Sequence, residues 1–109
     1  MTLKRKDWAV HKRIALSATN IVAKLALLDG WKLSGDGDAV SIEKTFRFDN
    51  YFETIAFVNA VALVAHKEDH HPELAVLYNR CTVRFNTHDV RGISASDFDC
   101  AAQLDALLA

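Results

Sequence analysis

The sequence predicts an α+β fold in which a four-stranded antiparallel sheet carries three helices packed on one face. Two segments, at residues 31–48 and 74–86, alternate apolar and polar side chains and resemble β-hairpins. Helical patterns precede, separate and follow these segments, which gives the order αββαββα. Hairpins separated by a helix favour an antiparallel sheet, because a short turn joins only antiparallel neighbours.

The composition is that of one globular domain over residues 1–109, since half of the residues are apolar and a quarter are charged. A formal net charge of −1 indicates no nucleic-acid partner, and we expect the basic residues within 1–15 to form a solvated, partly frayed extension. No apolar run resembles a signal peptide or a membrane span, so we expect a cytoplasmic protein. Cys81 and Cys100 form no CxxC motif, which favours two reduced thiols.

A first helix is predicted over residues 17–28 and a first hairpin over residues 31–48. Ser17 can cap the helix, and apolar residues at spacings of four and three follow it on one face. Gly30 ends the helix. The second strand of the hairpin alternates apolar and polar residues, with Lys44 as the exception on its apolar side.

A second helix is predicted from a cap at Asp49 or Asn50 to about Lys67. It is apolar on most sides, so we expect it to be covered twice, once by the sheet and once by something else, such as another subunit. Pro72 disfavours helical backbone at His71, which places the end of this helix near the histidine pair.

A second hairpin and a last helix complete the pattern. Residues 74–78 are predicted as a strand, Asn79 as a turn and residues 81–86 as the next strand. The segment from Ser94 to Asp97 is an acidic capping box that opens the last helix. Its residues at helical spacing are Phe98, Ala101, Ala102, Asp105 and Leu108.

Three of the five histidines, His70, His71 and His88, lie within nineteen residues of one another. The unperturbed pKa of imidazole is near neutrality, so this cluster indicates proton transfer or metal binding. Adjacent residues of an extended chain point in opposite directions, so His70 and His71 line one pocket only if the backbone turns between helix and strand. For His11, in the basic N-terminal stretch, a surface role is preferred.

The residues alone leave three interpretations of the cluster. The histidines can be structural. They can bind a metal, since His66 and His70 have two-ligand spacing, but no closed zinc motif is present and the pair lacks the Glu of HExxH. They can act as general acids and bases, with Asp69, Asp89 or Asp97 holding an imidazole in one tautomer. The metal interpretation is the weaker of the two chemical ones.

The sequence resembles the pterin-4a-carbinolamine dehydratase family. The family signature is a polar residue, then His-His-Pro, an aromatic residue, a second His and a final Asp. At the family's spacing, this sequence has His66, His70-His71-Pro72, Tyr78, His88 and Asp97. Flanking segments that agree are Gly30-Trp31, Thr45-Phe46-Arg47-Phe48, Thr87-His88 and Gly92-Ile93-Ser94. The similarity runs from about Leu16 to Leu107.

The resemblance implies an enzyme that removes water from a 4a-hydroxytetrahydropterin and yields the quinonoid dihydropterin. This reaction recycles the cofactor of aromatic amino acid hydroxylases, and neither a metal nor an organic cofactor is expected. The resemblance also implies a homodimer or homotetramer, in which a partner would cover the second helix. Because animal members also serve as dimerisation cofactors for a transcription factor, a non-catalytic binding module on the same fold is the alternative function.

The resemblance also implies roles for individual residues. We expect His70 and His88 to transfer protons and His71 mainly to orient the pterin, with all three as catalytic residues. Asp97 and His66 are expected to support the site. The expected substrate-binding residues are Asp69, His70, His71, Pro72, Asn86, Thr87, His88 and Asp89. Compared with animal members, His66 stands in place of Glu, Leu74 in place of Trp and Ser96 in place of Arg.

Overall fold

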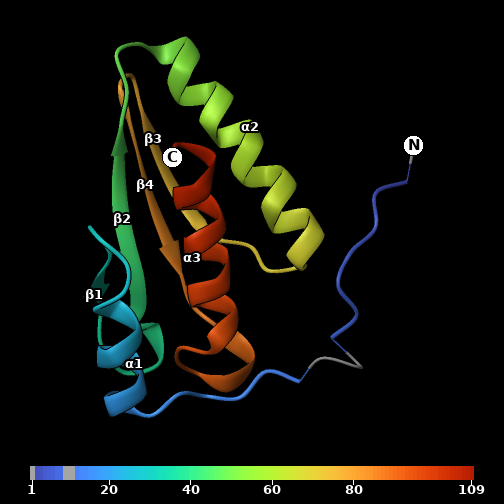
Figure 1. The fold of residues 1–109 in the computed structure, drawn as a ribbon, viewed down its shortest axis with the longest axis vertical. Coiled ribbons are helices and arrows are strands. Elements are labelled where there is room, and N and C mark those ends of the chain that lie inside the picture. Colours follow the sequence, from blue (N-terminus) through green and yellow to red (C-terminus); the bar gives the residue numbers. More distant parts are fainter. Residues whose placement is uncertain (1, 9–11) are drawn as a thin grey trace.

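The computed structural model describes residues 2–8 and 12–109, and it confirms the α+β class and the order αββαββα (Figure 1). The helices are α1 (Ala18–Leu25), α2 (Tyr51–Glu68) and α3 (Ala95–Leu107). The strands are β1 (Lys32–Ser34), β2 (Ser41–Arg47), β3 (Glu73–Leu77) and β4 (Arg80–Phe85). Short 3-10 helices, η1 (Gly37–Ala39) and η2 (His88–Val90), lie in the loops after β1 and β4. His11, for which a surface role was predicted, lies outside the described residues.

The strands form one antiparallel sheet in the order β1-β2-β4-β3. The two hairpins therefore meet at β2 and β4, where Ile42 lies opposite Phe85 and Arg47 opposite Arg80. Helices α2 and α3 lie side by side over one face of this sheet (Figure 1). No helix in the described ranges has the length and apolar character that a membrane span requires.

The hydrophobic core lies between the sheet and the helices. The alternation predicted for β4 is confirmed, since Cys81, Val83 and Phe85 are buried on the helix side while the residues between them face the other way. From β2, Ile42 is fully buried in the same layer. Full burial of a large apolar side chain contributes about 1.5–3 kcal/mol, so this shared layer holds the two hairpins together.

Helix α1 is shorter than predicted. It begins after the predicted cap, because the side chain of Ser17 accepts a hydrogen bond from the backbone of Asn20. It ends at Leu25 instead of residue 28, because the amides of Leu27 and Leu28 bond three residues back and tighten the chain into turns. Leu28 still packs against the core, and Gly30 adopts the positive φ of 82° that closes this segment.

Helix α2 is capped by Asn50, which is one of the two residues predicted for this position. The Asn50 side chain accepts a hydrogen bond from the amide of Glu53, whose carboxylate accepts in return from Asp49. On the outer side of the helix, Phe52 is 83 % exposed and Leu63 is 50 % exposed. The second cover predicted for this helix is therefore not supplied by the described residues of this chain.

Helix α3 has the predicted capping box, but its inner face differs from the prediction. Ala102 and Leu108 are exposed, whereas Leu104 is fully buried. The reason is that the helical spacing of three from Ala101 continues to Leu104, so the buried stripe lies one residue away from the predicted one. The buried hydrophobic residues of the helix are Phe98, Cys100, Ala101 and Leu104.

The polar exception on the apolar side of β2 is explained by a partly buried network of hydrogen bonds. The Lys44 ammonium donates to the carboxylate of Asp105 at 2.8 Å and to the carbonyl of Asp29 at 3.0 Å. The indole of Trp31 donates to the other oxygen of Asp105 at 3.0 Å. One carboxylate of α3 thus joins the helix to β2 and to the chain entering β1.

Candidate active site

The turn between α2 and β3 directs His70 and His71 to different surroundings. Asp69 ends the helix in the left-handed region with φ 46°, and the amide of His70 returns to the carbonyl of Ala65. Pro72 then keeps the chain extended. As a result His70 is only 5 % exposed, whereas His71 lies at the surface, as expected for neighbours in extended chain.

His70 forms a buried pair with Asp97. Its Nε2 lies 2.5 Å from Oδ1 of Asp97, which has no solvent exposure, and its ring stacks on Phe85 with centroids 5.9 Å apart. The second oxygen of Asp97 accepts from the Thr87 hydroxyl at 2.7 Å and from the amide of Ser94 at 3.0 Å. Asp97 therefore holds the histidine with one oxygen and caps α3 with the other.

These contacts determine which nitrogen of His70 carries the proton. A carboxylate only accepts hydrogen bonds, so Nε2 of His70 is the donor to Asp97. In the neutral ring this leaves Nδ1 with its lone pair, ready to take a proton. The Thr87 hydroxyl accepts from Ser94 and donates to Asp97, so the carboxylate keeps this orientation through a chain of buried hydrogen bonds.

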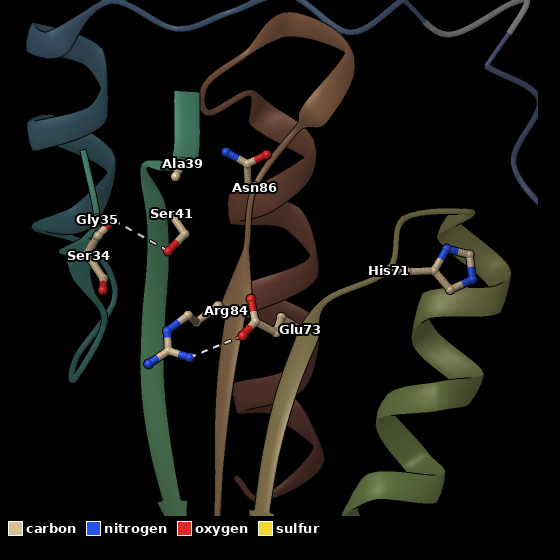
Figure 2. A pocket seen from close by; sticks show the side chains of 8 residues that line it. All are labelled: Ser34, Gly35, Ala39, Ser41, His71, Glu73, Arg84 and Asn86. Carbon is tan, nitrogen blue, oxygen red and sulfur yellow. Dashed lines mark hydrogen bonds and ion pairs between the residues drawn. The ribbon is translucent and has the colours of Figure 1, made fainter. Parts of the chain in front are cut away.

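A polar cavity of about 510 Å³ opens on the helix-free face of the sheet (Figure 2). Its lining comes from all four strands, their loops and the turn after α2. The lining residues are Ser34, Gly35, Ala39, Ser41, His71, Glu73, Arg84 and Asn86. In Figure 2, His71 lies on the turn between α2 and β3, to one side of the strand residues, and its ring extends away from them, so this turn lies at the edge of the cavity.

Charged side chains form a row across the sheet at the floor of this cavity. Arg84 donates to Glu43 at 2.9 Å and lies 3.5 Å from Glu73, and Lys32 lies 3.9 Å from Glu43 on the far side. A hydrogen bond from Ser34, followed by those from Arg84, lowers the pKa of Glu43 below its ordinary value. The two carboxylates pair with Nε and Nη1 of Arg84 and so hold its guanidinium in a fixed position at the cavity.

Asn86 and its neighbours occupy the end of β4. The Asn86 amide donates to the carbonyl of Val40 at 2.5 Å, which leaves its amide oxygen as an acceptor at the cavity. The peptide N–H and C=O of Thr87 both bond to Gly92. The peptide groups of Thr87, which was expected to bind the substrate, are therefore already paired within the loop.

The structure brings together only part of the predicted site. Of the predicted residues, His71 and Asn86 line the cavity, and Pro72 links His71 to a lining residue of β3. The predicted residues that do not line it are Asp69, His70, Thr87, His88 and Asp89. Among these, Thr87 and His70 both bond to the carboxylate of Asp97 on the helix side of the sheet. His88 lies exposed in η2.

Sequence reasoning missed four polar lining residues: Ser34, Ser41, Glu73 and Arg84. Ser34, Ser41 and Arg84 alternate with apolar residues, a signal that places them on the polar face, whereas Glu73 precedes the predicted strand at residues 74–78. Glu73 and Arg84 are opposite one another, as are Ser34 and Ser41, so the register brings them to the cavity. Strand order was the missing information.

The positions that depart from animal members lie away from the cavity. His66 contacts the carbonyl of Leu3 through Nε2 at 3.0 Å. Leu74 packs against the hydrophobic core, and Ser96 is buried in the first turn of α3. The Nε2 atoms of His66 and His70 contact different groups, the carbonyl of Leu3 and the carboxylate of Asp97. Within residues 2–8 and 12–109, no three His, Cys, Asp or Glu side chains gather as a metal site.

The two cysteines are buried in the core and are not joined to one another. Burial raises the pKa of the Cys100 thiol to about 12, and it also raises the pKa of Cys81. Both groups are therefore thiols at neutral pH and are poor nucleophiles. This agrees with the two reduced thiols predicted from the sequence.

Comparison with known proteins identifies relatives along almost the whole chain. A family model described as pterin 4 alpha carbinolamine dehydratase matches residues 14–107. A relative from Paracidovorax citrulli, named putative pterin-4-alpha-carbinolamine dehydratase, is 65 % identical over 107 residues, which cover 98 % of this chain and 92 % of that protein. A relative of the same name from Bdellovibrio bacteriovorus is 51 % identical and covers 96 % of this chain and 86 % of its own.

Solved structures show the same architecture. A protein from Brucella melitensis, described as a transcriptional coactivator/pterin dehydratase, superposes with a TM-score of 0.82 at 30 % identity over 88 % of this chain and 100 % of that one. A pterin dehydratase-like protein, described as a RuBisCO assembly factor in the alpha-carboxysome, has a TM-score of 0.61 at 23 % identity, over 72 % of this chain and 88 % of that one. The second likeness shows the fold alone.

Proposed function

Because the chain belongs to the pterin 4 alpha carbinolamine dehydratase family, we propose that it dehydrates a 4a-hydroxytetrahydropterin to the quinonoid dihydropterin. The observation that supports this proposal is the buried pair of His70 and Asp97, whose histidine directly precedes His71, a lining residue of the polar cavity. The proposed reaction uses side chains alone, with neither a metal nor an organic cofactor.

The reaction requires two proton transfers on one heterocycle. The bond between C4a and the hydroxyl oxygen breaks, and that oxygen takes a proton and leaves as water. The proton on N5 is removed, and its bonding electrons form the new double bond between N5 and C4a. A positioned side chain accelerates each such transfer by typically about 10²- to 10⁴-fold. Imidazoles suit both steps, because they gain and lose protons near neutral pH.

We assign these transfers to His70 and His88. His70 has Nε2 bonded to Asp97, so only Nδ1 is available to exchange a proton, and the carboxylate stabilises the imidazolium that forms. His88 is exposed and directly follows Thr87, whose hydroxyl bonds to the same carboxylate. His71, which lines the cavity, orients the pterin.

The cavity matches the polar edge of a pterin. That edge carries N–H donors next to a carbonyl acceptor. The Glu73 carboxylate and the Asn86 amide oxygen can accept from the donors, and the Arg84 guanidinium can donate to the carbonyl. These groups come from neighbouring strands, so they form a wall against which a flat ring can lie. Asp69 and Asp89 flank the histidines and complete the proposed binding set.

The proposal is tested on 4a-hydroxytetrahydropterin generated by an aromatic amino acid hydroxylase, which is the proposed partner in metabolism. We expect the purified protein to accelerate its decay near neutral pH, measured by stopped-flow absorbance. His71→Ala should lower kcat/KM by about 10²-fold while leaving the melting curve unchanged, since His71 is exposed. An unchanged decay with the native protein would sink the enzymatic proposal.

A second candidate function is a coactivator-type binding module on the same fold. The solved structure from Brucella melitensis, described as a transcriptional coactivator/pterin dehydratase, favours it. It predicts a specific protein partner and no turnover. Robust turnover together with the absence of any partner in affinity purification would rule it out as the main role.

A further inference from the structure

The segment before α1 runs back along the end of α2 and reaches both loops that carry the proposed catalytic histidines (Figure 1). We infer that Arg13, held by Trp8, is a positioning residue that sets the spacing between the His70-His71 turn and the loop of His88. The inference rests on the proposed function, because that function gives these histidines their catalytic roles. Arg13 and Trp8 both precede the part of the chain that matches the family model.

A single guanidinium touches the chain neighbours of both histidine groups. One terminal nitrogen of Arg13 donates to the carbonyl of Asp69 at 2.7 Å, and the other donates to the carboxylate of Asp89 at 2.9 Å. Asp69 directly precedes His70, and Asp89 directly follows His88. Arg13 is therefore a bridge between two loops that lie far apart in the sequence.

The indole of Trp8 holds this guanidinium in place. The Cζ atom of Arg13 lies 3.9 Å from the centroid of the Trp8 ring, a distance suited to cation–π stacking. The Trp8 Nε1 donates to the carbonyls of Glu68 at 3.0 Å and Asp69 at 3.1 Å. With its ring bonded to the end of α2, Trp8 gives Arg13 a rigid surface on which to lie.

The contacts of the N-terminal segment are to backbone carbonyls at the C-terminal end of α2. The last carbonyls of a helix have no intrahelical donor, and they carry a partial negative charge. The amide of Lys6 donates to the carbonyl of Lys67 at 2.8 Å, so residues 67–69 each give a carbonyl to the N-terminal segment. The segment therefore anchors to backbone whose position also determines where His70 and His71 begin.

The geometry requires arginine in particular. The Arg13 side chain is 15 % exposed, and its Nε is the one buried side-chain nitrogen or oxygen without a partner in the described part of the chain. The orientation that directs both terminal nitrogens to Asp69 and Asp89 thus leaves the Nε donor of Arg13 without a partner. A lysine in this position has a single ammonium and no planar fork, so it cannot reproduce the bridge and the stacking together.

The test compares Arg13→Ala and Arg13→Lys with Arg5→Ala in the full-length protein. Arg5 is the matched control, because it lies 3.6 Å from the Asp69 carboxylate on the same segment but is 60 % exposed and does not reach Asp89. We expect both Arg13 variants to lower kcat about 10- to 100-fold with a smaller change in KM, because misplaced groups slow the chemical step. Arg5→Ala should match the native enzyme.

A second measurement separates positioning from general stability. In Arg13→Ala, hydrogen exchange of residues 88–91 should accelerate and the imidazole NMR signals of His88 should shift, while exchange in the core strand β4 stays native. Asp89→Asn should reproduce the kcat loss, and the double variant should be no slower than Arg13→Ala alone. If Arg13→Ala folds poorly, Arg13→Lys takes its place in the exchange and kinetic comparison with Asp89→Asn.

The outcomes are distinct from those that test the proposed function. If the native protein does not dehydrate the pterin, exchange and NMR still show whether Arg13 orders the loop of His88. If Arg13→Ala equals Arg5→Ala in kcat and in exchange, or if the losses from Arg13→Ala and Asp89→Asn are additive, the bridge has no positioning role and the inference is wrong.

Discussion

At the scale of single residues, Asp97 serves the helix and the histidine at once. Its Oδ2 accepts from the amide of Ser94 and the hydroxyl of Thr87, so only Oδ1 remains for His70. The amide of Ser94 cannot become an acceptor, which fixes the direction of the carboxylate. The tautomer of His70 therefore depends on Asp97, which the sequence pattern predicts as part of a helix cap.

Replacing Asp97 with Asn tests this dependence. The Asn oxygen must face the Ser94 amide, so the Asn NH₂ faces Nε2 of His70 and moves the ring proton to Nδ1. We expect kcat to fall by about 10²- to 10⁴-fold, because the histidine is held in the wrong tautomer. Nitrogen-15 NMR of the His70 ring should report the exchange of tautomers.

Thr87→Ser is the matched control for this substitution, since it keeps the hydroxyl that donates to Asp97. We expect its kcat and its His70 tautomer to remain close to native. If Asp97→Asn retained native turnover, the tautomer of His70 would be irrelevant and its proposed role would fail.

At the scale of elements, one carboxylate on α3 links three segments. Asp105→Ala removes the acceptor for the half-buried Lys44 ammonium and for the Trp31 indole. Leaving donors without their partner costs about 1–3 kcal/mol, so we expect the free energy of unfolding to fall by that amount. Urea denaturation measures it. Asp99→Ala on the exposed side of the same helix should change it by about 0.5 kcal/mol or less, and equal losses would contradict the linking role.

The charged row across the sheet predicts a pH dependence of stability. The hydrogen bonds from Ser34 and Arg84 lower the pKa of Glu43 in the folded state, so this carboxylate stabilises the fold above its unfolded pKa, near 4.5. That contribution is lost as the pH falls through the lowered, folded pKa. Glu43→Gln should thus be less stable than native at pH 7, with the difference vanishing in strong acid. A constant difference between pH 7 and pH 3 would contradict this role of Glu43.

The elements were predictable from sequence wherever the signal was local. The alternation of β4 and the capping box at Ser94 and Asp97 follow from neighbours within one element, and both are confirmed. The wall formed by Glu73 and Arg84 was not predicted, although β3 and β4 were predicted as a hairpin, because Glu73 precedes the predicted strand at residues 74–78. The bridge by Arg13 was missed for a related reason, since a basic stretch without periodicity gives no sign of a partner 76 residues away.

At the scale of the whole molecule, the histidines divide between two sides of the sheet. His70 lies with Asp97 toward the helices, while His71 lines the cavity on the helix-free face. Between these two adjacent residues, in the turn from α2 to β3, the chain passes from the helix layer to the sheet. A short turn therefore separates the buried pair of His70 and Asp97 from the exposed His71 at the cavity, and we propose that proton transfer occurs at this junction.

The outer side of α2 predicts an assembly. An apolar groove of about 410 Å³ lies between α2 and the end of α3, and Phe52 lines it with 83 % of its surface exposed. Apolar surface of this kind on a helix is typical of a contact between subunits. We therefore expect a homodimer or homotetramer in solution, with α2 covered by a second copy, and multi-angle light scattering measures its mass.

Phe52→Glu should lower this mass, because the new charge would have to be buried in the contact. Leu27→Glu is a close control, since Leu27 is also 83 % exposed but follows α1 and lies outside the groove. It should leave the mass unchanged. A monomeric native protein, or equal loss of mass in both variants, would contradict the assembly through α2. A lower mass in Phe52→Glu alone would show that the second cover predicted for this helix is another copy of the chain.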